Sequence, residues 1–500
     1  MSAEEIRSQV LFAKKKPDGP ASAALVQELK TPPPILQVFA NLQERAYPFF
    51  LDSAARGPRL GRYSFLGAEP FLVLTAREKE IEIIEGGKRR VIIGNPFSEL
   101  RRLFALYRVD AKDAPVPFLA GAVGYFAYDL KDFIERLPQT AVKDLSLPDL
   151  YLAFYDSVIA YDHIENKAYI SAVDFNAEDA RGAQAHACAR LLRLKAFLEN
   201  LPAKEPAQAE EFQSFPLPSN FTQKDYLAAV RRAKEYIAAG DIYQVNLSQR
   251  FHTRISCSPY ELYLRLRAIN PAPFAAYFRF DDFAVLSSSP ERFLKVTGSH
   301  IETRPIKGTR PRGRTPQEDE RLKKELYQSE KDNAELAMIV DLERNDLGRV
   351  CDYGSVKVTE PKVLETFPTV HHLVATVEGE MHPRYDLVDL LKATFPGGSI
   401  TGAPKIRAME IIDELEPTRR SVYTGAIGYM DFGGNMDLNI VIRTILVHRQ
   451  EAYFQVGGGI VADSLPQAEY DETMDKARAL IASLRQVPVV IERCGRGQEK

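Results

Sequence analysis

Paired strands, rather than a regular alternation of strands and helices, dominate the apolar pattern of this chain. Residues 80–94 read EIEIIEGGKRRVIIG, two apolar-alternating runs about a Gly-Gly turn, which is typical of a β-hairpin. Residues 149–175 predict a strand pair that turns at 165–167, and residues 439–462 predict two strands about 449–451. Hairpins interrupted by helices favour an α+β fold with large antiparallel sheets.

One segment in the middle of the chain has no apolar periodicity. Residues 201–220 are rich in Pro, Glu, Gln and Ser, so we interpret them as a linker or a long surface loop. We therefore expect an N-terminal region of residues 1–200, a second region of residues 221–486 and a tail of residues 487–500. A helix over 223–239, ended by Gly240, opens the second region.

Composition excludes several classes of protein. The 500 residues carry 65 basic and 68 acidic side chains, so charge gives no general attraction to nucleic acid or to an anionic membrane. The first 25 residues lack the apolar core of a signal peptide, and no stretch approaches the roughly 20 apolar residues of a membrane span. We expect a cytoplasmic protein. The four cysteines form no CxxC pair, which argues against a cysteine zinc site or a disulfide framework.

The sequence lacks two familiar catalytic motifs, a phosphate-binding loop and the cysteine motif of a glutaminase. The stretch GGSITGAPK, residues 397–405, resembles a phosphate loop, but Ala403 stands where the loop needs lysine. No cysteine lies in a Gly-x-Cys-x-Gly elbow, the setting of a glutamine-hydrolysing thiol. If the protein uses glutamine nitrogen, another chain has to release it.

Two predicted helices carry acidic side chains one turn apart. Such pairs are usually solvated surface, but facing pairs would offer oxygen ligands that suit Mg²⁺. The side chains are Asp332 and Glu335 in residues 329–348, and Glu469 and Glu472, followed by Lys476, in residues 464–484.

Two basic residues permit either a plain or a functional interpretation. Lys307 lies in RPIKGTRPRG, residues 304–313, which is either a solvated basic loop or the setting of a nucleophilic amine. Arg443 interrupts an apolar strand, where a buried guanidinium needs either a bidentate anion or a partner carboxylate.

Many ordered segments of the second region resemble the catalytic region of the chorismate-using enzymes. The matching stretches include GDIYQVNLSQRF, SSSPERF, RPIKGTRPRG, AELAMIVDLERNDLGRV, FPGGSITGAPKIRAMEIIDELEP, YTGAIGY, NIVIRT, GGGIVADS and EYDETMDKA. The first region resembles the same group more faintly, in FLDSA and GRYSFLG. The resemblance implies antiparallel sheets packed as a sandwich with helices outside.

The resemblance also implies roles for individual residues. Glu335 and Glu472 match Mg²⁺ ligands that hold the ring carboxylate of chorismate, and Asp332 and Glu469 match acidic neighbours that act through water. His372 matches a histidine near the leaving hydroxyl, although a lone histidine is more often structural. The expected substrate-binding residues are Thr309, Ser399, Thr401, Tyr423, Arg443, Gly457, Gly459 and Lys476.

Two positions distinguish the branches of this family. The isochorismate and salicylate branch has a water-activating lysine where this chain has Gln244. Anthranilate synthases usually read Pro-Ile-Ala-Gly-Thr where this chain has Lys307, which is the aminodeoxychorismate synthase pattern. In that branch Lys307 attacks C2 of chorismate, ammonia then attacks C4, and Glu291 protonates the departing hydroxyl. The amine must be neutral, and burial beside Mg²⁺ and Arg304 is expected to lower its pKa.

The expected reaction is the conversion of chorismate and ammonia into 4-amino-4-deoxychorismate, for p-aminobenzoate and folate synthesis. It requires Mg²⁺ and a separate glutaminase subunit that supplies ammonia. Two alternatives stay open: an anthranilate synthase, and a regulatory subunit that binds tryptophan. The second rests on Ser53 in FLDSA and on Asn270 and Pro271 in NPAPF, which resemble segments of the tryptophan pocket in this group.

Overall fold

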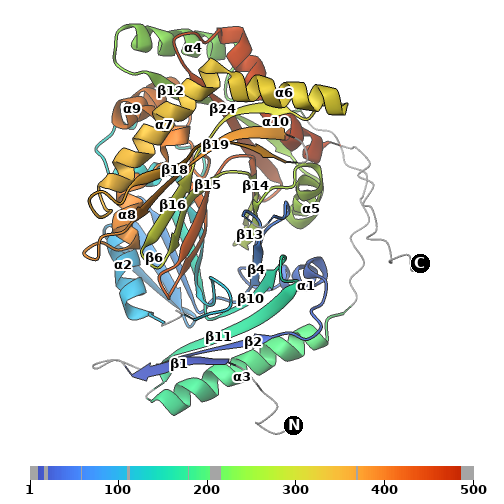
Figure 1. The fold of residues 1–500 in the computed structure, drawn as a ribbon. Coiled ribbons are helices and arrows are strands. Elements are labelled where there is room, and N and C mark those ends of the chain that lie inside the picture. The colour runs from blue at the N-terminus through green and yellow to red at the C-terminus, as the bar shows by residue number, and fades with distance from the viewer. Residues whose placement is uncertain are drawn as a thin grey trace.

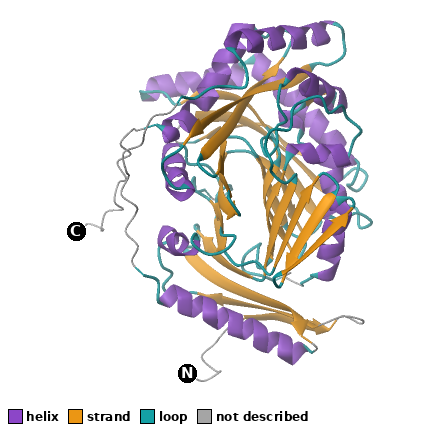
Figure 2. Cartoon of the chain, turned by 180° about the vertical axis from the view of Figure 1, so that it is seen from behind, coloured by secondary structure: helices purple, strands orange, loops and turns teal. Residues whose placement is uncertain are grey.

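The computed structural model describes residues 9–15, 21–57, 59–109, 113–177, 179–202, 216–367 and 370–485. These residues form two twelve-stranded sheets, in which the paired strands run antiparallel. The sheets face each other and helices lie outside them (Figures 1 and 2). The predicted α+β sandwich is therefore confirmed.

Both sheets draw strands from early and late parts of the chain. The first has the order β1 (Gln9–Lys15), β2 (Ala21–Glu28), β11 (Lys167–Ala177), β10 (Ser157–Asp162), β4 (Tyr63–Gly67), β3 (Phe49–Asp52), β13 (Phe274–Phe280), β14 (Phe283–Ser289), β23 (Thr444–His448), β24 (Glu451–Ile460), β12 (Gln244–Arg254) and β20 (Gly402–Ala403). The second has the order β17 (Ile306–Pro311), β19 (Val370–Glu380), β16 (His300–Arg304), β15 (Arg292–Thr297), β22 (Met436–Ile440), β21 (Ala426–Asp431), β8 (Gly121–Phe126), β9 (Leu150–Tyr155), β5 (Leu72–Arg77), β6 (Glu80–Glu85) and β7 (Lys88–Ile93), with β18 (Lys357–Thr366) paired to β19.

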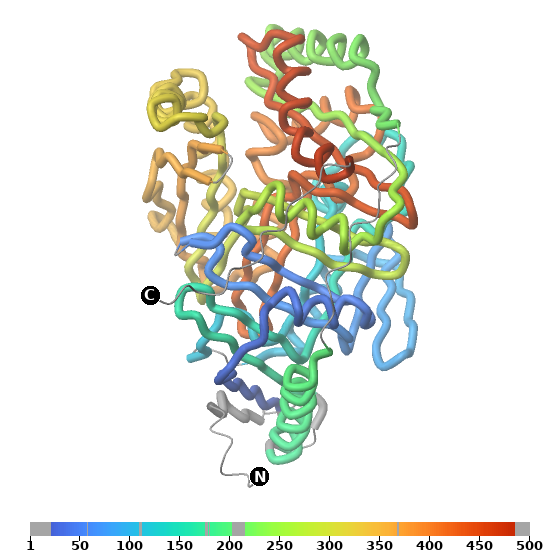
Figure 3. Tube along the Cα trace, turned by 90° about the vertical axis from the view of Figure 1, so that its right-hand side faces the viewer, coloured from blue at the N-terminus to red at the C-terminus, as the bar shows by residue number. Residues whose placement is uncertain are grey.

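The helices divide between the two outer faces. The first sheet is covered by α1 (Ile35–Leu42), α3 (Ala180–Glu199), α5 (Pro259–Ile269) and α10 (Pro466–Leu484). The second is covered by α2 (Pro96–Leu106), α6 (Pro316–Gln328), α7 (Glu330–Gly348) and α8 (Leu387–Thr394), while α4 (Gln223–Ala238) and α9 (Lys405–Leu415) pack on β12. Figure 3 shows α3 at the end of the molecule opposite α4 and α10.

Aromatic side chains fill the space between the sheets. The rings of Phe49 and Tyr155 have centroids 4.5 Å apart, and Tyr151 stacks on Phe278 at 6.0 Å, each pair joining one sheet to the other. All four residues are buried. Burial of such rings is the main favourable contribution to holding two sheets together.

The chain crosses from one sheet to the other at short connections that the sequence did not reveal. Pro290 and Glu291 join β14 to β15, and residues 441–443 join β22 to β23. Arg443 therefore does not interrupt a strand, as its apolar flanks had indicated; it lies at a crossover with φ 53°. The prediction was wrong because the apolar flanks belong to strands of two different sheets.

The predicted helices are present. The strand pair predicted over 149–175 is wrong in part, because the segment forms three strands: β9 lies in the second sheet, and only β10 and β11 form a hairpin, in the first. The 80–94 hairpin turns through Gly86 and Gly87, both at positive φ, and 444–460 forms two strands about Arg449. Within the described residues, no helix is both long and apolar enough to cross a membrane. The linker predicted at 201–220 and the tail at 487–500 lie largely or wholly outside these residues, and the division into regions stays a prediction.

Candidate active site

Lys307 lies at a junction of three segments that are distant in the sequence. It comes from β17, and its Nζ donates to the backbone oxygen of Ser399 at 3.0 Å in the short helix η2 (Gly398–Ile400). Asn246 of β12 donates to the same oxygen at 2.9 Å. The Ser399 hydroxyl donates to Oε1 of Glu291 at 2.6 Å. An amine, a carboxyl group and a Gly-rich turn are therefore brought together.

The surroundings of Lys307 favour its neutral form. Burial lowers the pKa of its amine, and the charge of Lys476 lowers it further, while Glu335 and Glu291 act in the opposite direction. Arg304 does not play the part predicted for it, since its guanidinium forms an ion pair with Glu365 at 2.6 Å. The second cation near Lys307 is Lys476, from α10.

Glu291 has the environment of a proton donor. It lies at the crossover between β14 and β15, its side chain is 4% exposed, and burial raises its pKa. The hydroxyl of Ser399 and the charge of Lys307 partly oppose that rise. A carboxyl group with a raised pKa holds its proton more firmly than a free one, which suits it to protonate a leaving group.

The acidic side chains of α7 and α10 meet across the site. Nζ of Lys331 lies 3.9 Å from Oε1 of Glu335 and 3.9 Å from Oε1 of Glu469, so one ammonium spans the two helices. A β-carbon added at Gly458 would lie 3.3 Å from Oε1 of Glu472 and 3.4 Å from Oε2 of Glu469. Glu469 and Glu472 therefore lie beside the glycine-rich end of β24, and Lys331 links Glu469 to Glu335.

These carboxylates differ in their protonation equilibria. Burial raises the pKa of Glu335 and of Glu469, whereas the ammonium of Lys476, 2.7 Å from Oε1 of Glu472, lowers the pKa of Glu472. A divalent cation would relieve the same concentration of negative charge, and an all-oxygen donor set suits Mg²⁺. Within the described residues, no group of three His, Cys, Asp or Glu side chains is already arranged to hold a metal ion.

Asp332 lies one turn before Glu335 on α7, where its charge raises the pKa of Glu335, and it also contacts β17. Its Oδ2 is 3.2 Å from Nη2 of Arg310, and a β-carbon at Gly308 would lie 2.9 Å from its Cγ. Asp332 thus packs against β17, where Gly308, at φ 73°, lets the strand and the helix approach closely.

Backbone groups and cations line the other side of the site. Nη1 of Arg443 donates to the oxygen of Lys476 at 2.8 Å, and Nζ of Lys476 donates to the oxygen of Gly457 at 2.9 Å. Among the described residues, no carboxylate lies within ion-pair distance of Arg443. The alternative of a partner Asp or Glu is therefore not seen, and the guanidinium is open to an anionic ligand.

Two glycines of β24 allow close approach of β12. A β-carbon added at Gly457 would lie 2.6 Å from the backbone oxygen of Leu247. One added at Gly459 would lie 2.5 Å from Nε2 of Gln244. Tyr423 is partly buried next to the guanidinium of Arg420, 5.8 Å from the ring centroid, and burial raises the pKa of its phenol.

The remaining predicted residues support the site through short contacts. His372 is buried, its Nδ1 lies 2.9 Å from Oγ1 of Thr309, and burial lowers its pKa to about 3, so the ring is neutral at neutral pH. The hydroxyl of Thr401 donates to the oxygen of Gly397 at 3.0 Å and thereby closes the turn that carries Ser399.

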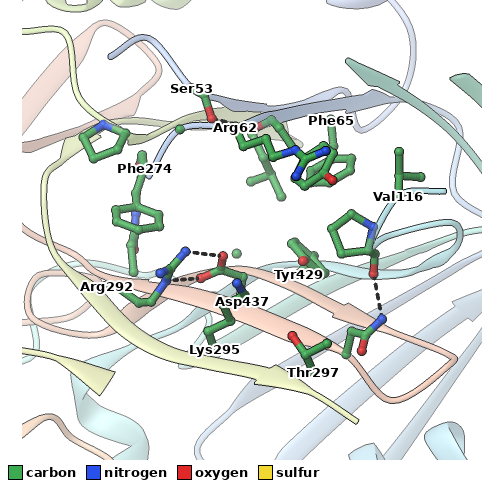
Figure 4. Close-up of a pocket in the computed structure, with 18 of the residues that line it drawn as sticks. Ser53, Arg62, Phe65, Val116, Phe274, Arg292, Lys295, Thr297, Tyr429 and Asp437 are labelled. Carbon is green, nitrogen blue, oxygen red and sulfur yellow. Dashed lines mark hydrogen bonds and ion pairs between the residues drawn. The ribbon is translucent and has the colours of Figure 1, made fainter. Parts of the chain in front are cut away.

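A separate cavity of about 1170 Å³ contains one of the three residues predicted for tryptophan. Ser53 lines it together with Arg62, Phe274 and Arg292 (Figure 4). Asn270 and Pro271 do not line it; Nδ2 of Asn270 donates instead to the hydroxyl of Ser288 at 3.3 Å. The lining contains none of Lys307, Glu335 and Glu472, so the cavity is distinct from the acidic site.

Two residues of the site were missed in the sequence. Asn246 and Gln244 are two residues apart on β12 and so share one face of the strand. This polar pair in an apolar strand could have indicated that Asn246 belongs to the site. Lys331 lies among three other charged residues at the start of its helix, Glu330, Asp332 and Glu335, and nothing in that pattern distinguishes it from solvated surface.

Comparison with known proteins assigns a family. Residues 49–482 match the model of the chorismate binding enzymes. The chain is 41% identical over 453 residues to aminodeoxychorismate synthase component 1 of Bacillus subtilis, covering 90% of this chain and 94% of that protein. It is 39% identical over 475 residues to anthranilate synthase component 1 of Aquifex aeolicus, covering 93% and 94%.

A solved structure agrees with this assignment. Anthranilate synthase component I of Streptococcus pneumoniae superposes with a TM-score of 0.75 at 33% identity, over 86% of this chain and 93% of that chain. Relatives with two different activities are thus similar to this chain to nearly the same degree. The choice between the two activities therefore depends on the residues of the site.

Proposed function

This chain belongs to the chorismate binding enzymes, and from that membership we propose that it converts chorismate and ammonia into 4-amino-4-deoxychorismate. The observation that carries the proposal is the position of Lys307: its amine is hydrogen-bonded to Ser399 and lies among Glu291, Glu335 and Lys476. The reaction replaces a hydroxyl by nitrogen at the same carbon. Two successive displacements achieve this, and the first needs a nucleophile from the protein.

We infer that chorismate binds as a dianion between the acidic helices and the basic side of the site. Glu335 and Glu472 would hold Mg²⁺, with Glu469 and Asp332 acting through water, and bound Mg²⁺ supplies positive charge for the ring carboxylate. Arg443, Lys476 and the amides of Gly457 and Gly459 would receive the second carboxylate, with Tyr423 and Thr309 beside them.

The proposed chemistry has two displacements. In the first, a bond forms between Nζ of Lys307 and C2, the two ring double bonds each shift by one position toward C4, the C4–O bond breaks, and Glu291 protonates the departing oxygen to give water. The alkylated amine returns a proton to Glu291. In the second, ammonia bonds to C4, the two ring double bonds shift back, the C2–N bond breaks, and the surplus proton of the new ammonium passes to the departing amine. Lys307 and Glu291 are regenerated, with neutral His372 near the leaving hydroxyl.

Ammonia is proposed to come from a glutaminase subunit that associates with this chain. The support is chemical: no cysteine of the sequence has the Gly-x-Cys-x-Gly setting of a glutamine-hydrolysing thiol. Ammonium salt should replace that subunit in an assay.

The nearest alternative is formation of anthranilate. The distinguishing test is incubation of the purified chain with chorismate, Mg²⁺ and ammonium, followed by identification of the product by mass and fluorescence. We expect 4-amino-4-deoxychorismate. Anthranilate as the main product would refute the proposal.

The cavity beside Ser53 supports a second, regulatory candidate. We propose that it accepts tryptophan, as the sequence resemblance implies. Calorimetric titration with tryptophan, repeated with Ser53→Trp to fill the cavity, tests this. Heat of binding that the substitution abolishes is the expected result, and its absence from the unsubstituted protein would leave the cavity without this role.

A further inference from the structure

A buried carboxyl group lies directly behind the turn that carries Ser399. Glu343 belongs to α7, its side chain is 2% exposed, and its Oε1 accepts a hydrogen bond from the amide of Gly398 at 3.1 Å. A β-carbon added at Gly398 would lie 2.6 Å from Cδ2 of Leu342, so the helix is packed tightly against this turn. Glu343 therefore fixes the backbone immediately before Ser399.

The charges around Glu343 leave it without a counterion. The groups that face it are Asp346 on the same helix, Lys405 of α9 and Glu291 across the turn. Lys405 forms an ion pair with Asp346 and donates to the oxygen of Thr394 at 2.8 Å. Within the described residues, no cation forms an ion pair with Glu343, and its Oε2 is buried without a hydrogen-bond partner.

A carboxylate in this position would be costly. Two carboxyl groups and one ammonium share a buried space, and the ammonium pairs with Asp346. Burial raises the pKa of Glu343 and the charge of Asp346 raises it further, against the smaller effects of Lys405 and of the Gly398 amide. The arrangement of charges and the direction of the shift agree.

We propose that Glu343 is a positioning residue that works as a neutral carboxylic acid, holding the Gly398 amide and thereby the Ser399 atoms that bind Lys307 and Glu291. A neutral group performs this task without adding a negative charge near Lys307, which would favour the protonated, non-nucleophilic amine. The inference about the proton stands on the structure alone; its consequence for turnover rests on the proposed function.

Three variants test the proposal. Glu343→Gln keeps an acceptor for Gly398 and has the shape of the protonated acid. Glu343→Leu has similar volume and no acceptor. Asp341→Asn is the matched control, because Asp341 is an exposed carboxylate on the same helix, with 73% of its side chain exposed.

The first measurement is urea unfolding between about pH 5 and pH 9, which needs no substrate. An acid whose pKa is raised by folding contributes stability that is complete below its unfolded pKa and is lost as the pH rises through the folded pKa. We expect the unfolding midpoint of Glu343→Gln to fall less with rising pH than that of the unsubstituted chain or of Asp341→Asn. An unchanged pH dependence in Glu343→Gln would overturn the claim that Glu343 is protonated.

The second measurement is steady-state turnover of chorismate with Mg²⁺ and ammonium. We expect Glu343→Gln to keep kcat within about threefold, and Glu343→Leu to lose roughly tenfold or more in kcat, equivalent to about 1.4 kcal/mol, with a smaller change in KM. Equal losses in the Gln and Leu variants would show that the negative charge is needed and would overturn the positioning role. If the unsubstituted chain does not consume chorismate, the proposed function fails, while the unfolding comparison still decides whether Glu343 is protonated.

Discussion

The proposed reaction depends on which of two neighbouring groups holds a proton. Lys307 needs a free lone pair and Glu291 needs a proton to donate, and burial moves both pKa values in the required directions. Both side chains contact Ser399, one through its backbone oxygen and one through its hydroxyl. A single turn of the chain thus sets the positions of the nucleophile and of the acid.

Glu291→Gln separates these two protonations in the pH profile. The unsubstituted enzyme should give a bell-shaped profile of kcat/KM, because protonated Lys307 cannot attack at low pH and ionised Glu291 cannot donate at high pH. The variant should lose about 10²- to 10⁴-fold in kcat, and its residual rate should rise with pH and then level off. Glu380→Gln, on an exposed part of β19, is the control and should keep both limbs. An alkaline limb that persists in Glu291→Gln would assign it to another group.

Among the elements, β24 determines how closely the acidic helix α10 approaches the sheet. Its glycines leave space for carboxylates on one side and for β12 on the other. Glu291 and Arg443 lie in the two connections where the chain passes from one sheet to the other. The site therefore depends on strand pairing in both sheets.

Gly458→Ala tests the role of that space in metal binding. The added methyl group would lie 3.3 Å from Oε1 of Glu472, close enough to displace that carboxylate by a few tenths of an ångström, and 3.4 Å from Oε2 of Glu469. We expect the Mg²⁺ concentration for half-maximal activity to rise by roughly tenfold, in the range seen when groups around metal ligands are displaced. Gly348→Ala, at the end of α7 with open space around its β-carbon, should leave the Mg²⁺ requirement unchanged. An identical Mg²⁺ requirement in both variants would contradict the proposed metal position.

The complete sandwich is shared between the two regions that composition had separated. Strands β3 and β4 lie between β10 and β13 in the first sheet, and β8 lies beside β21 in the second. The aromatic layer between the sheets also draws on both regions, as in the contact of Tyr151 with Phe278.

A fragment of residues 221–486 should therefore fail to fold alone. It would expose the edge of β13 and the buried face that packs on β9, and unpaired apolar edges promote aggregation. Circular dichroism and size-exclusion chromatography of this fragment, beside the full chain, check the expectation. A soluble fragment with a cooperative thermal transition would contradict it.

Local structure and the chemistry of single residues could be predicted from the sequence better than contacts between distant segments. The hairpin at 80–94 and the helix over 466–484 follow from apolar periodicity and are confirmed. The crossover at Arg443 could not be predicted, because a strand that ends in one sheet and a strand that begins in the other look like one apolar run. The pairing of Asp332 with Arg310 and the burial of Glu343 depend on how helices pack, which spacing along one helix does not specify.

The covalent role of Lys307 can be tested by intact-protein mass spectrometry of enzyme mixed with chorismate and Mg²⁺ in the absence of ammonia. We expect an adduct with the mass of chorismate less one water, located on Lys307 by peptide mapping. Lys295→Ala, at a lysine lining the separate cavity, should retain that adduct, whereas Lys307→Ala should form neither adduct nor 4-amino-4-deoxychorismate. Undiminished product formation by Lys307→Ala would contradict a covalent role for Lys307.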